Sequence, residues 1–235
     1  MSFDPYEFDR SIMPNTQAES IGQYTAKTFL WMVLGLMITF GVAVASWLSG
    51  VVYLAYQGHL ILLVATLILS ITMASRIEKM RVGTAVGIFV AFSTLFGLTL
   101  SVYLLAFNLA SVVFCFLATA VYFGALAAYG YLTHRDLSSL RVILTSGLIF
   151  LIIFGLLSMF IPVFSALDQI VCLIGIGIFL AYTAYDTQKI RAYYNYYAGY
   201  PDMLAKASVF SALQLYLDFL NLFLYLLRFM GSRRN

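Results

Sequence analysis

Charged side chains are scarce in this sequence of 235 residues, where Asp, Glu, Lys and Arg together make up 10% of the chain. Soluble domains carry about 25% charged residues. Hydrophobic residues account for 63% of the sequence, compared with about 45–50% in ordinary globular proteins. The composition therefore excludes a soluble domain and predicts a membrane protein that crosses the bilayer several times.

Cysteine and histidine are also rare. Cys115 and Cys172 both fall inside apolar runs, where a free thiol behaves as a small hydrophobe, so no disulfide framework is predicted. His59 and His134 are far apart in sequence and have no cysteine near them, so we expect no resident metal or other cofactor. The net charge of +3 comes from residues spread along the chain without a run of like charges. Nucleic acid is therefore excluded as a partner class.

No polar or Pro/Gly-rich linker divides the chain after its first 25 residues, so residues 25–235 are predicted to form one membrane domain. Residues 1–24 differ from the rest, because they carry most of the N-terminal charge and two of the four prolines. They contain no apolar segment typical of a signal peptide. We expect them to form a disordered, cytosolic N-terminal tail.

Long uncharged windows indicate the membrane spans, since a spanning helix needs about 20 apolar residues. The interval from Val82 to Thr133 has no charge and is too long for one crossing, so we expect a turn near Asn108. The predicted architecture is all-α, with seven transmembrane helices. The expected spans are Thr28–Leu48, Val51–Ser75, Val82–Phe107, Leu109–Leu132, Val142–Ile161, Gln169–Lys189 and Leu204–Phe229.

Lysine and arginine occur only in alternate loops, which predicts an N-terminus in the cytosol. The basic loops contain Arg10, Lys27, Arg76, Lys79, Arg81, Arg135, Arg141, Lys189, Arg191 and Lys206. Seven crossings would leave the C-terminus outside, although Arg228, Arg233 and Arg234 favour the cytosol. The last helix therefore either crosses or is re-entrant, and its length favours a crossing.

Asp186 and Asp218 are the carboxylates that this topology places at membrane depth. An ionised Asp at a helix centre costs about 2.5–3.5 kcal/mol on insertion scales. Such residues are tolerated when they are buried in the bundle, protonated or hydrated, and they commonly mark functional sites. The alternative is a structural role in which each Asp caps or bonds a neighbouring helix.

The spacing of the two aspartates suggests that they meet. Gly199, Tyr200 and Pro201 have the chemistry of a turn and lie midway between them. From Tyr200, the aspartates are about 21 Å and 27 Å away along two antiparallel helices. Two carboxyl groups in contact titrate as a pair, which would make them a proton-sensitive latch.

Several neighbouring side chains are candidates to support this pair. Arg76, at the end of the second span, is the predicted counter-ion, although it could equally be an ordinary basic loop residue beside Lys79. Gln214 and Asn221 lie within about one turn of Asp218 and would extend a polar stripe along the last helix or pore. Their alternative role is hydrogen bonding between packed helices.

Paired motifs near the C-terminus resemble those of the Bax inhibitor-1 family, particularly its bacterial members. These motifs are "AYTAYDTQKI" and "ALQLYLDFLNLFLYLLRFMG". "FGLTLSVY" and "GYLTHRDLSSL" extend the resemblance over most of the chain.

The resemblance implies a seven-helix fold whose last helix is central, and a pH-sensitive leak of calcium ions. The di-aspartyl pair that governs this leak corresponds to Asp186 and Asp218, which would also contact Ca²⁺ transiently. The family's latching arginine corresponds to Arg76, or Lys79 stands in its place. Oxygen ligands of this type suit Ca²⁺. The expected location is the bacterial inner (plasma) membrane, or an internal membrane in a eukaryote.

Two other functions compete with a calcium leak. The protein could be a regulator of cell stress, cell death or membrane proteolysis that binds other membrane proteins without transporting ions. A pair of aspartates is also found in intramembrane aspartyl proteases. Asp218 stands in "LYLD", without the preceding glycines of that class, and no Pro-Ala-Leu element follows. An enzyme is therefore not predicted.

Overall fold

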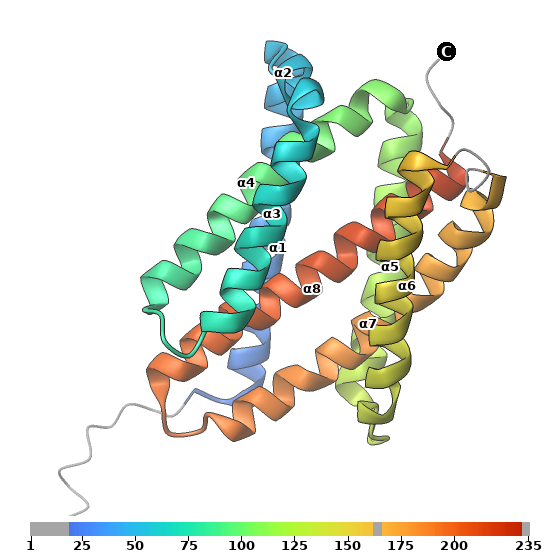
Figure 1. The fold of residues 1–235 in the computed structure, drawn as a ribbon. Helices are drawn as coiled ribbons and strands as arrows, with labels where there is room; N and C mark the ends of the chain where they lie inside the picture. The colour runs from blue at the N-terminus through green and yellow to red at the C-terminus, as the bar shows by residue number, and fades with distance from the viewer. Residues whose placement is uncertain (1–18, 162–165, 232–235) are drawn as a thin grey trace, which may run out of the picture.

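The computed structural model describes residues 19–161 and 166–231. Within these ranges the regular elements are α-helices and short 3-10 turns, among them η2 (Figure 1). The all-α prediction is confirmed. The helices are α1 (Ile21–Ser49), α2 (Val52–Gln57), α3 (His59–Arg76), α4 (Val82–Ala106), α5 (Leu109–Leu132), α6 (Arg141–Phe160), α7 (Asp168–Tyr196) and α8 (Pro201–Met230), and η2 is Ser138–Leu140.

Local sequence signals set several of the helix ends. Ser20 caps α1 in a reciprocal capping box with Gln23, and Gly50 ends the helix at φ 80°. Helix α1 thus begins at Ile21, inside the segment predicted as a tail, and Tyr24 is fully buried. The expectation for residues 1–18 lies outside the described residues. The side chain of Asn108 caps α5 through the Ala110 N–H and marks the predicted α4–α5 hairpin.

The second predicted span, Val51–Ser75, begins too early. The chain forms the six-residue α2, breaks at Gly58, and continues as α3 from His59. Glycine has poor helix propensity, so this apolar window does not remain a single helix. The remaining predicted spans coincide with helices, although α1 and α7 extend several residues beyond their predicted ends.

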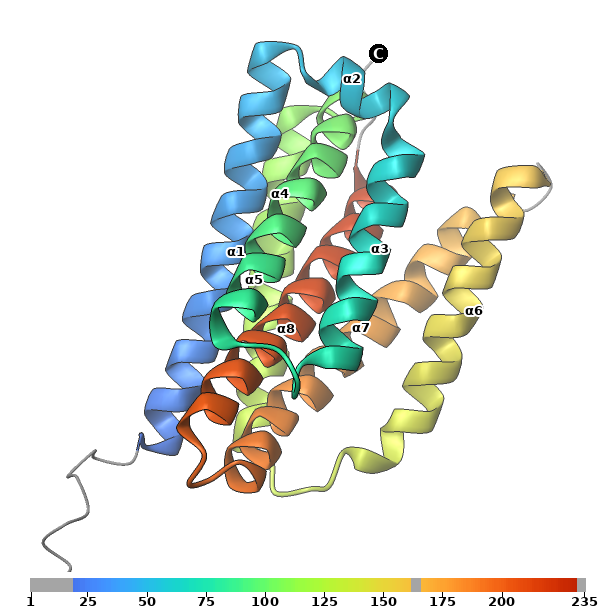
Figure 2. The same ribbon diagram turned by 60° about the vertical axis from the view of Figure 1, so that its left-hand side comes forward.

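Seven of the described helical segments are long and apolar enough to cross a membrane. Helix α8 is the most enclosed, since 67% of its most apolar window is buried, whereas the other segments range from 11% to 44%. Figures 1 and 2 show α8 passing between the other helices. Helix α6 lies at the outside and packs chiefly against α7 (Figure 2). The central position of the last helix is therefore confirmed.

Helix α8 traverses the bundle from one end to the other. Its 30 residues extend over about 45 Å at the usual helical rise. Its first turn lies near the start of α1, and its last turn lies at the opposite end of the bundle (Figures 1 and 2). This favours the crossing over the re-entrant alternative.

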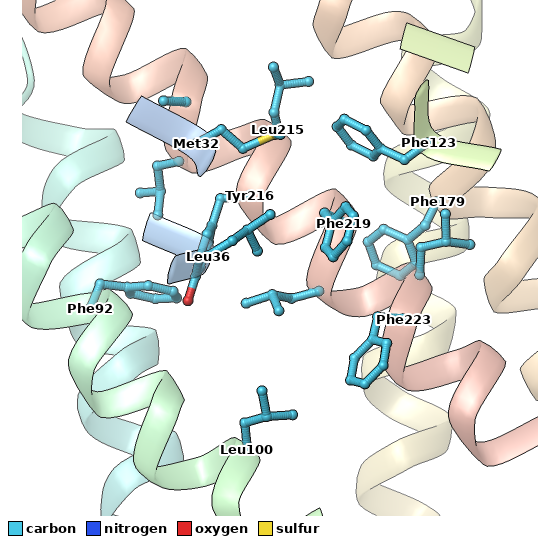
Figure 3. Close-up of a cluster of buried hydrophobic side chains, with 14 of the residues drawn as sticks. Met32, Leu36, Phe92, Leu100, Phe123, Phe179, Leu215, Tyr216, Phe219 and Phe223 are labelled. Atoms are coloured by element: carbon cyan, nitrogen blue, oxygen red, sulfur yellow. The ribbon is translucent and has the colours of Figure 1, made fainter. Parts of the chain in front are cut away.

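The core is built around the aromatic side chains of α8. Tyr216 is fully buried, and its ring centroid lies 5.8 Å from those of both Phe89 and Phe92 on α4. The Tyr216 hydroxyl hydrogen bonds to Thr39 of α1. Figure 3 shows Tyr216 and Phe219 within the central cluster of hydrophobic side chains. Burial of such large side chains stabilises the position of α8 at the centre.

Candidate functional site

A tight turn folds α7 back onto α8. The turn contains Gly199 at φ 90°, a conformation that favours glycine, and Pro201 begins α8 where its missing N–H costs nothing. The predicted turn is therefore confirmed. The two helices pack closely along their length. Their antiparallel arrangement brings Asp186 of α7 and Asp218 of α8 to the interior of the bundle.

Asp186 is 6% exposed and has a cationic neighbour on its own helix. The Lys189 Nζ lies 3.2 Å from Asp186 Oδ1 and donates a hydrogen bond to it. The same ammonium group lies 5.2 Å from the ring centroid of Tyr185 and 5.6 Å from that of Tyr193. Lys189 is therefore held between two aromatic rings and one carboxylate, an arrangement that stabilises a cation in apolar surroundings.

Asp218 is 4% exposed and lacks a comparable partner. Its Oδ2 is buried and accepts no hydrogen bond from any residue that the structure describes. The charges of Asp186 and Lys189 both act on the Asp218 carboxyl group. A buried carboxylate without a partner is costly, so this oxygen requires a proton, a water molecule or a cation.

The candidate site therefore consists of two buried carboxyl groups and one ammonium group. No histidine, cysteine or further acidic side chain joins them into a cluster of three metal ligands within the described ranges. The site can exchange protons, and it offers hard oxygen atoms to a hydrated cation.

Hydroxyl groups connect this site with the end of the bundle where α1 begins. Thr28 Oγ1 lies 3.0 Å from Ser208 Oγ across the α1–α8 interface. One turn further along α8, Ser211 Oγ is buried without a hydrogen-bond partner among the described residues, as is Tyr24 OH. Ser211 and Asp218 are seven residues apart, nearly two turns, and so lie on one face of α8. Unsatisfied hydroxyl groups of this kind are typical places for buried water.

A family model described as "Inhibitor of apoptosis-promoting Bax1" matches residues 21–235 of this chain. The chain belongs to the Bax inhibitor-1 family. Inner membrane protein YbhL of Escherichia coli (strain K12) is 38% identical over 216 residues, which cover 90% of this chain and 92% of YbhL. Protein RP147 of Rickettsia prowazekii (strain Madrid E) is 37% identical over 221 residues, which cover 92% of each chain. The predicted resemblance is therefore confirmed.

A more distant relative shows the same extent of similarity. An uncharacterised protein of Borreliella burgdorferi is 33% identical over 217 residues, or 91% of this chain and 93% of that protein. The family match over residues 21–235 includes all the helices described above. Together with the spanning helices, family membership establishes this chain as a multi-pass membrane protein.

In this family member, the predicted counter-ion Arg76 stands apart from the aspartates. Arg76 is the last residue of α3 and is exposed, as is Lys79 in the following turn. Neither side chain makes an ion pair with a carboxylate in the part of the chain that the structure describes. The latching role of Arg76 stays a prediction, and Lys189 is the cation that the structure places beside Asp186. The i, i+3 spacing of Asp186 and Lys189 could have indicated this pair from the sequence.

The two predicted members of the polar stripe are half-buried on α8. Asn221 Nδ2 donates a hydrogen bond to the Leu217 carbonyl of its own helix at 2.8 Å. Gln214 has no hydrogen-bond partner among the described residues. The pore-lining role of both residues stays a prediction, while the buried hydroxyl groups on α1 and α8 are polar residues that the sequence did not single out.

Proposed function

We propose that this protein is a pH-sensitive channel that leaks calcium ions and is gated by the Asp186–Asp218 pair. The observation that carries the proposal is the buried, unpartnered Oδ2 of Asp218 within electrostatic reach of Asp186. When both groups are charged, repulsion and desolvation favour separation of α7 from α8, entry of water, or binding of a cation. Calcium accepts carboxylate and water oxygens in flexible geometry, so a hydrated ion could pass such a site.

Helix α8 is the element through which this gate would act. Because α8 is central and contacts α1, α4, α5 and α7, a small movement of α8 changes packing throughout the bundle. Buried hydroxyl groups of Tyr24 and Ser211 offer a route for water from one end of the bundle towards Asp218. In this scheme, Lys189 holds Asp186 charged and in position, whereas Asp218 changes its protonation.

Calcium flux into proteoliposomes, measured as a function of pH, tests this mechanism. Wild-type flux should increase as the pair loses its proton. Asp218→Asn should remove the pH dependence because an amide cannot titrate in this range, and Asp186→Asn should remove it because the repulsion between two charged groups is lost. The matched control is Asp202→Asn, since Asp202 is an exposed carboxylate in the first turn of α8. A wild-type pH profile in both site variants would exclude gating by the pair.

A wild-type protein that passes no calcium at any pH would instead favour the non-transporting regulator that acts by binding other membrane proteins. Deletion of residues 1–18 is the suitable test of that alternative, since it spares the capped start of α1. A regulator that uses this segment to bind its partner should lose its cellular effect. A leak through the bundle should survive the deletion.

We further propose a location in the bacterial inner membrane with the N-terminus in the cytosol. The proposal is supported by the similarity to the inner membrane protein YbhL and by the basic residues at the bundle end where α1 begins. A membrane-impermeant maleimide should label Gln57→Cys on intact cells but label Ser139→Cys only after permeabilisation. Both positions are exposed, whereas the native Cys115 and Cys172 are buried. The opposite labelling pattern would reverse the orientation.

A further inference from the structure

Helices α1 and α5 face each other across an apolar groove. Its upper part has a volume of about 560 Å³, and its lower part has a volume of about 380 Å³. Met32 of α1 and Phe123 of α5 line both parts, so the two form one continuous α1/α5 groove. Phe219 of α8 also lines it, and Figure 3 shows Met32 and Phe123 on either side of the α8 segment that contains Phe219.

The dimensions of the groove suit a lipid chain. On α1 it extends from Thr25 to Val44, or about 28 Å of helix, close to the thickness of the bilayer hydrocarbon core. Small residues on α5 keep the lower part open. A Cβ atom added at Gly124 would meet nothing within 4 Å. In a membrane, an apolar space of this shape is filled by hydrocarbon.

A basic cavity of about 340 Å³ adjoins the lower end of the groove, and Tyr131 lines both spaces. The Arg191 guanidinium lies 5.4 Å from the Tyr131 ring centroid, and its Nη2 donates a hydrogen bond to the Tyr131 carbonyl at 3.0 Å. Arg135 and His134 line the same cavity from the loop after α5. Neither arginine forms an ion pair within residues 19–161 and 166–231. Their positive charge is therefore available to an anion.

The one carboxylate that lines the cavity is already engaged. Asp136 accepts hydrogen bonds from the N–H and the hydroxyl of Ser138, at 2.8 Å and 2.7 Å. These two bonds hold the pKa of the Asp136 carboxyl below its usual value. The two arginines and the one aspartate leave the cavity with a net positive charge of one. The charge is thus concentrated at the end of an apolar groove, which matches the chemistry of an anionic lipid.

We propose that the α1/α5 groove and the basic cavity together bind one anionic phospholipid. One acyl chain lies in the groove, and the phosphate lies beside Arg135 and Arg191. Guanidinium groups form strong, charge-assisted hydrogen bonds with phosphate oxygens. Basic pockets between membrane helices commonly accept lipid headgroups. Tyr131, at the junction, suits the boundary between hydrocarbon and headgroup. Neither Asp186 nor Asp218 lines the groove or the cavity, and the proposal does not depend on the proposed channel function.

Lipid binding to the delipidated full-length protein in detergent tests the headgroup part of the site. Native mass spectrometry would compare phosphatidylglycerol with phosphatidylcholine of the same chain length. We expect phosphatidylglycerol to bind about tenfold more tightly. The Arg135→Gln/Arg191→Gln double variant should bring its affinity down to that of phosphatidylcholine. Arg81→Gln/Arg141→Gln is the matched control, because these exposed arginines do not line the cavity, and it should keep the preference.

The single variant Arg135→Gln controls for loss of structure. The Arg135 side chain makes no hydrogen bond among the described residues, so its replacement should leave the fold intact. It should still weaken phosphatidylglycerol binding severalfold.

Gly124→Leu fills the groove and should weaken the binding of both lipids. Gly155→Leu on α6 is its control, because a Cβ there also meets nothing within 4 Å and Gly155 does not line the groove.

Three results would overturn the proposal. The first is equal binding of the two lipids by the wild type. The second is unchanged lipid affinity in Gly124→Leu, which would place the lipid elsewhere. The third is displacement of phosphatidylglycerol by millimolar inorganic phosphate, which would identify a site for free phosphate rather than for a lipid. The lipid proposal would be supported if phosphatidylglycerol stays bound in the presence of millimolar phosphate, and if its binding is weakened both in Arg135→Gln/Arg191→Gln and in Gly124→Leu.

Discussion

The Lys189 ammonium nitrogen lies 3.2 Å from Asp186 Oδ1, three residues earlier on α7. Both side chains are largely enclosed, with 26% of Lys189 and 7% of Asp186 exposed. Lys189 is the more exposed member, so the ion pair extends from the buried Asp186 carboxyl group towards a more accessible part of α7. It also gives Asp186 a partner that Asp218 Oδ2 does not have, so the two aspartates differ in environment.

Removal of Lys189 should shift the pH profile of calcium flux. In Lys189→Gln, the aspartate pair loses a nearby positive charge, so Asp218 should release its proton only at a higher pH. A charge at this distance typically changes titration by about 1–3 pH units. We therefore expect the half-maximal flux in proteoliposomes to move upward by at least about one pH unit. Lys27→Gln, which removes an exposed lysine paired with Glu19, should leave the midpoint unchanged. An unshifted midpoint in Lys189→Gln would separate Lys189 from the gate.

The α5–α7 contact depends on a glycine close to the site. A Cβ added at Gly130 would lie 2.2 Å from the Ala184 carbonyl oxygen, two residues before Asp186. Because backbone cannot give way cheaply, Gly130→Ala should lower the free energy of unfolding by about 1–3 kcal/mol. Gly124→Ala, on the same helix but with open space around its Cβ, should be neutral or stabilise by up to about 1 kcal/mol. Unfolding in detergent measures both. Equal effects would show that the close approach does not matter.

The ends of α7 and α8 opposite the turn are joined by an ion pair between Asp168 and Arg228. About a third of each side chain is exposed, so its contribution is small. Arg228→Asp should lower the free energy of unfolding by no more than about 1 kcal/mol through loss of the ion pair, and repulsion between the two aspartates should add to this loss. The unfolding temperature should therefore fall slightly. The swap Asp168→Arg/Arg228→Asp should restore most of the loss, because the pair is re-formed with its charges exchanged. Failure of the swap to recover stability would show that the two residues act independently.

Asp136, in the loop between α5 and α6, has a carboxyl pKa that depends on the hydrogen bonds it accepts. Donors from Ser138 favour the ionised form of Asp136 and hold its pKa below the usual value. Ser138→Ala removes the hydroxyl donor but keeps the backbone donor, so the pKa of Asp136 should rise part of the way back. Carboxyl carbon chemical shifts in Asp-labelled protein, assigned with Asp136→Asn, would follow this change. A pKa that stays fixed would attribute the whole effect to the Ser138 N–H.

Much of the fold could be predicted because it depends on local properties. Apolar windows of sufficient length identified the spanning helices, and Asn108, Gly199 and Pro201 marked turns. Gly58 indicated a loop after the first span, although the apolar window that predicted the second span already began at Val51 and so included α2. The hydrocarbon environment thus determines which segments become helices, while single residues determine where they end.

The sequence by itself determined that the chain crosses the membrane, that it belongs to its family, and that two carboxylates lie in the last two helices. Only the tertiary structure decided which groups surround them. It placed Lys189 rather than Arg76 beside Asp186, left Asp218 Oδ2 without a protein donor in the described chain, and opened the groove between α1 and α5. The physical reason is that hydropathy acts on each segment alone, whereas partners and cavities depend on which helix faces meet and how closely their small residues allow them to pack.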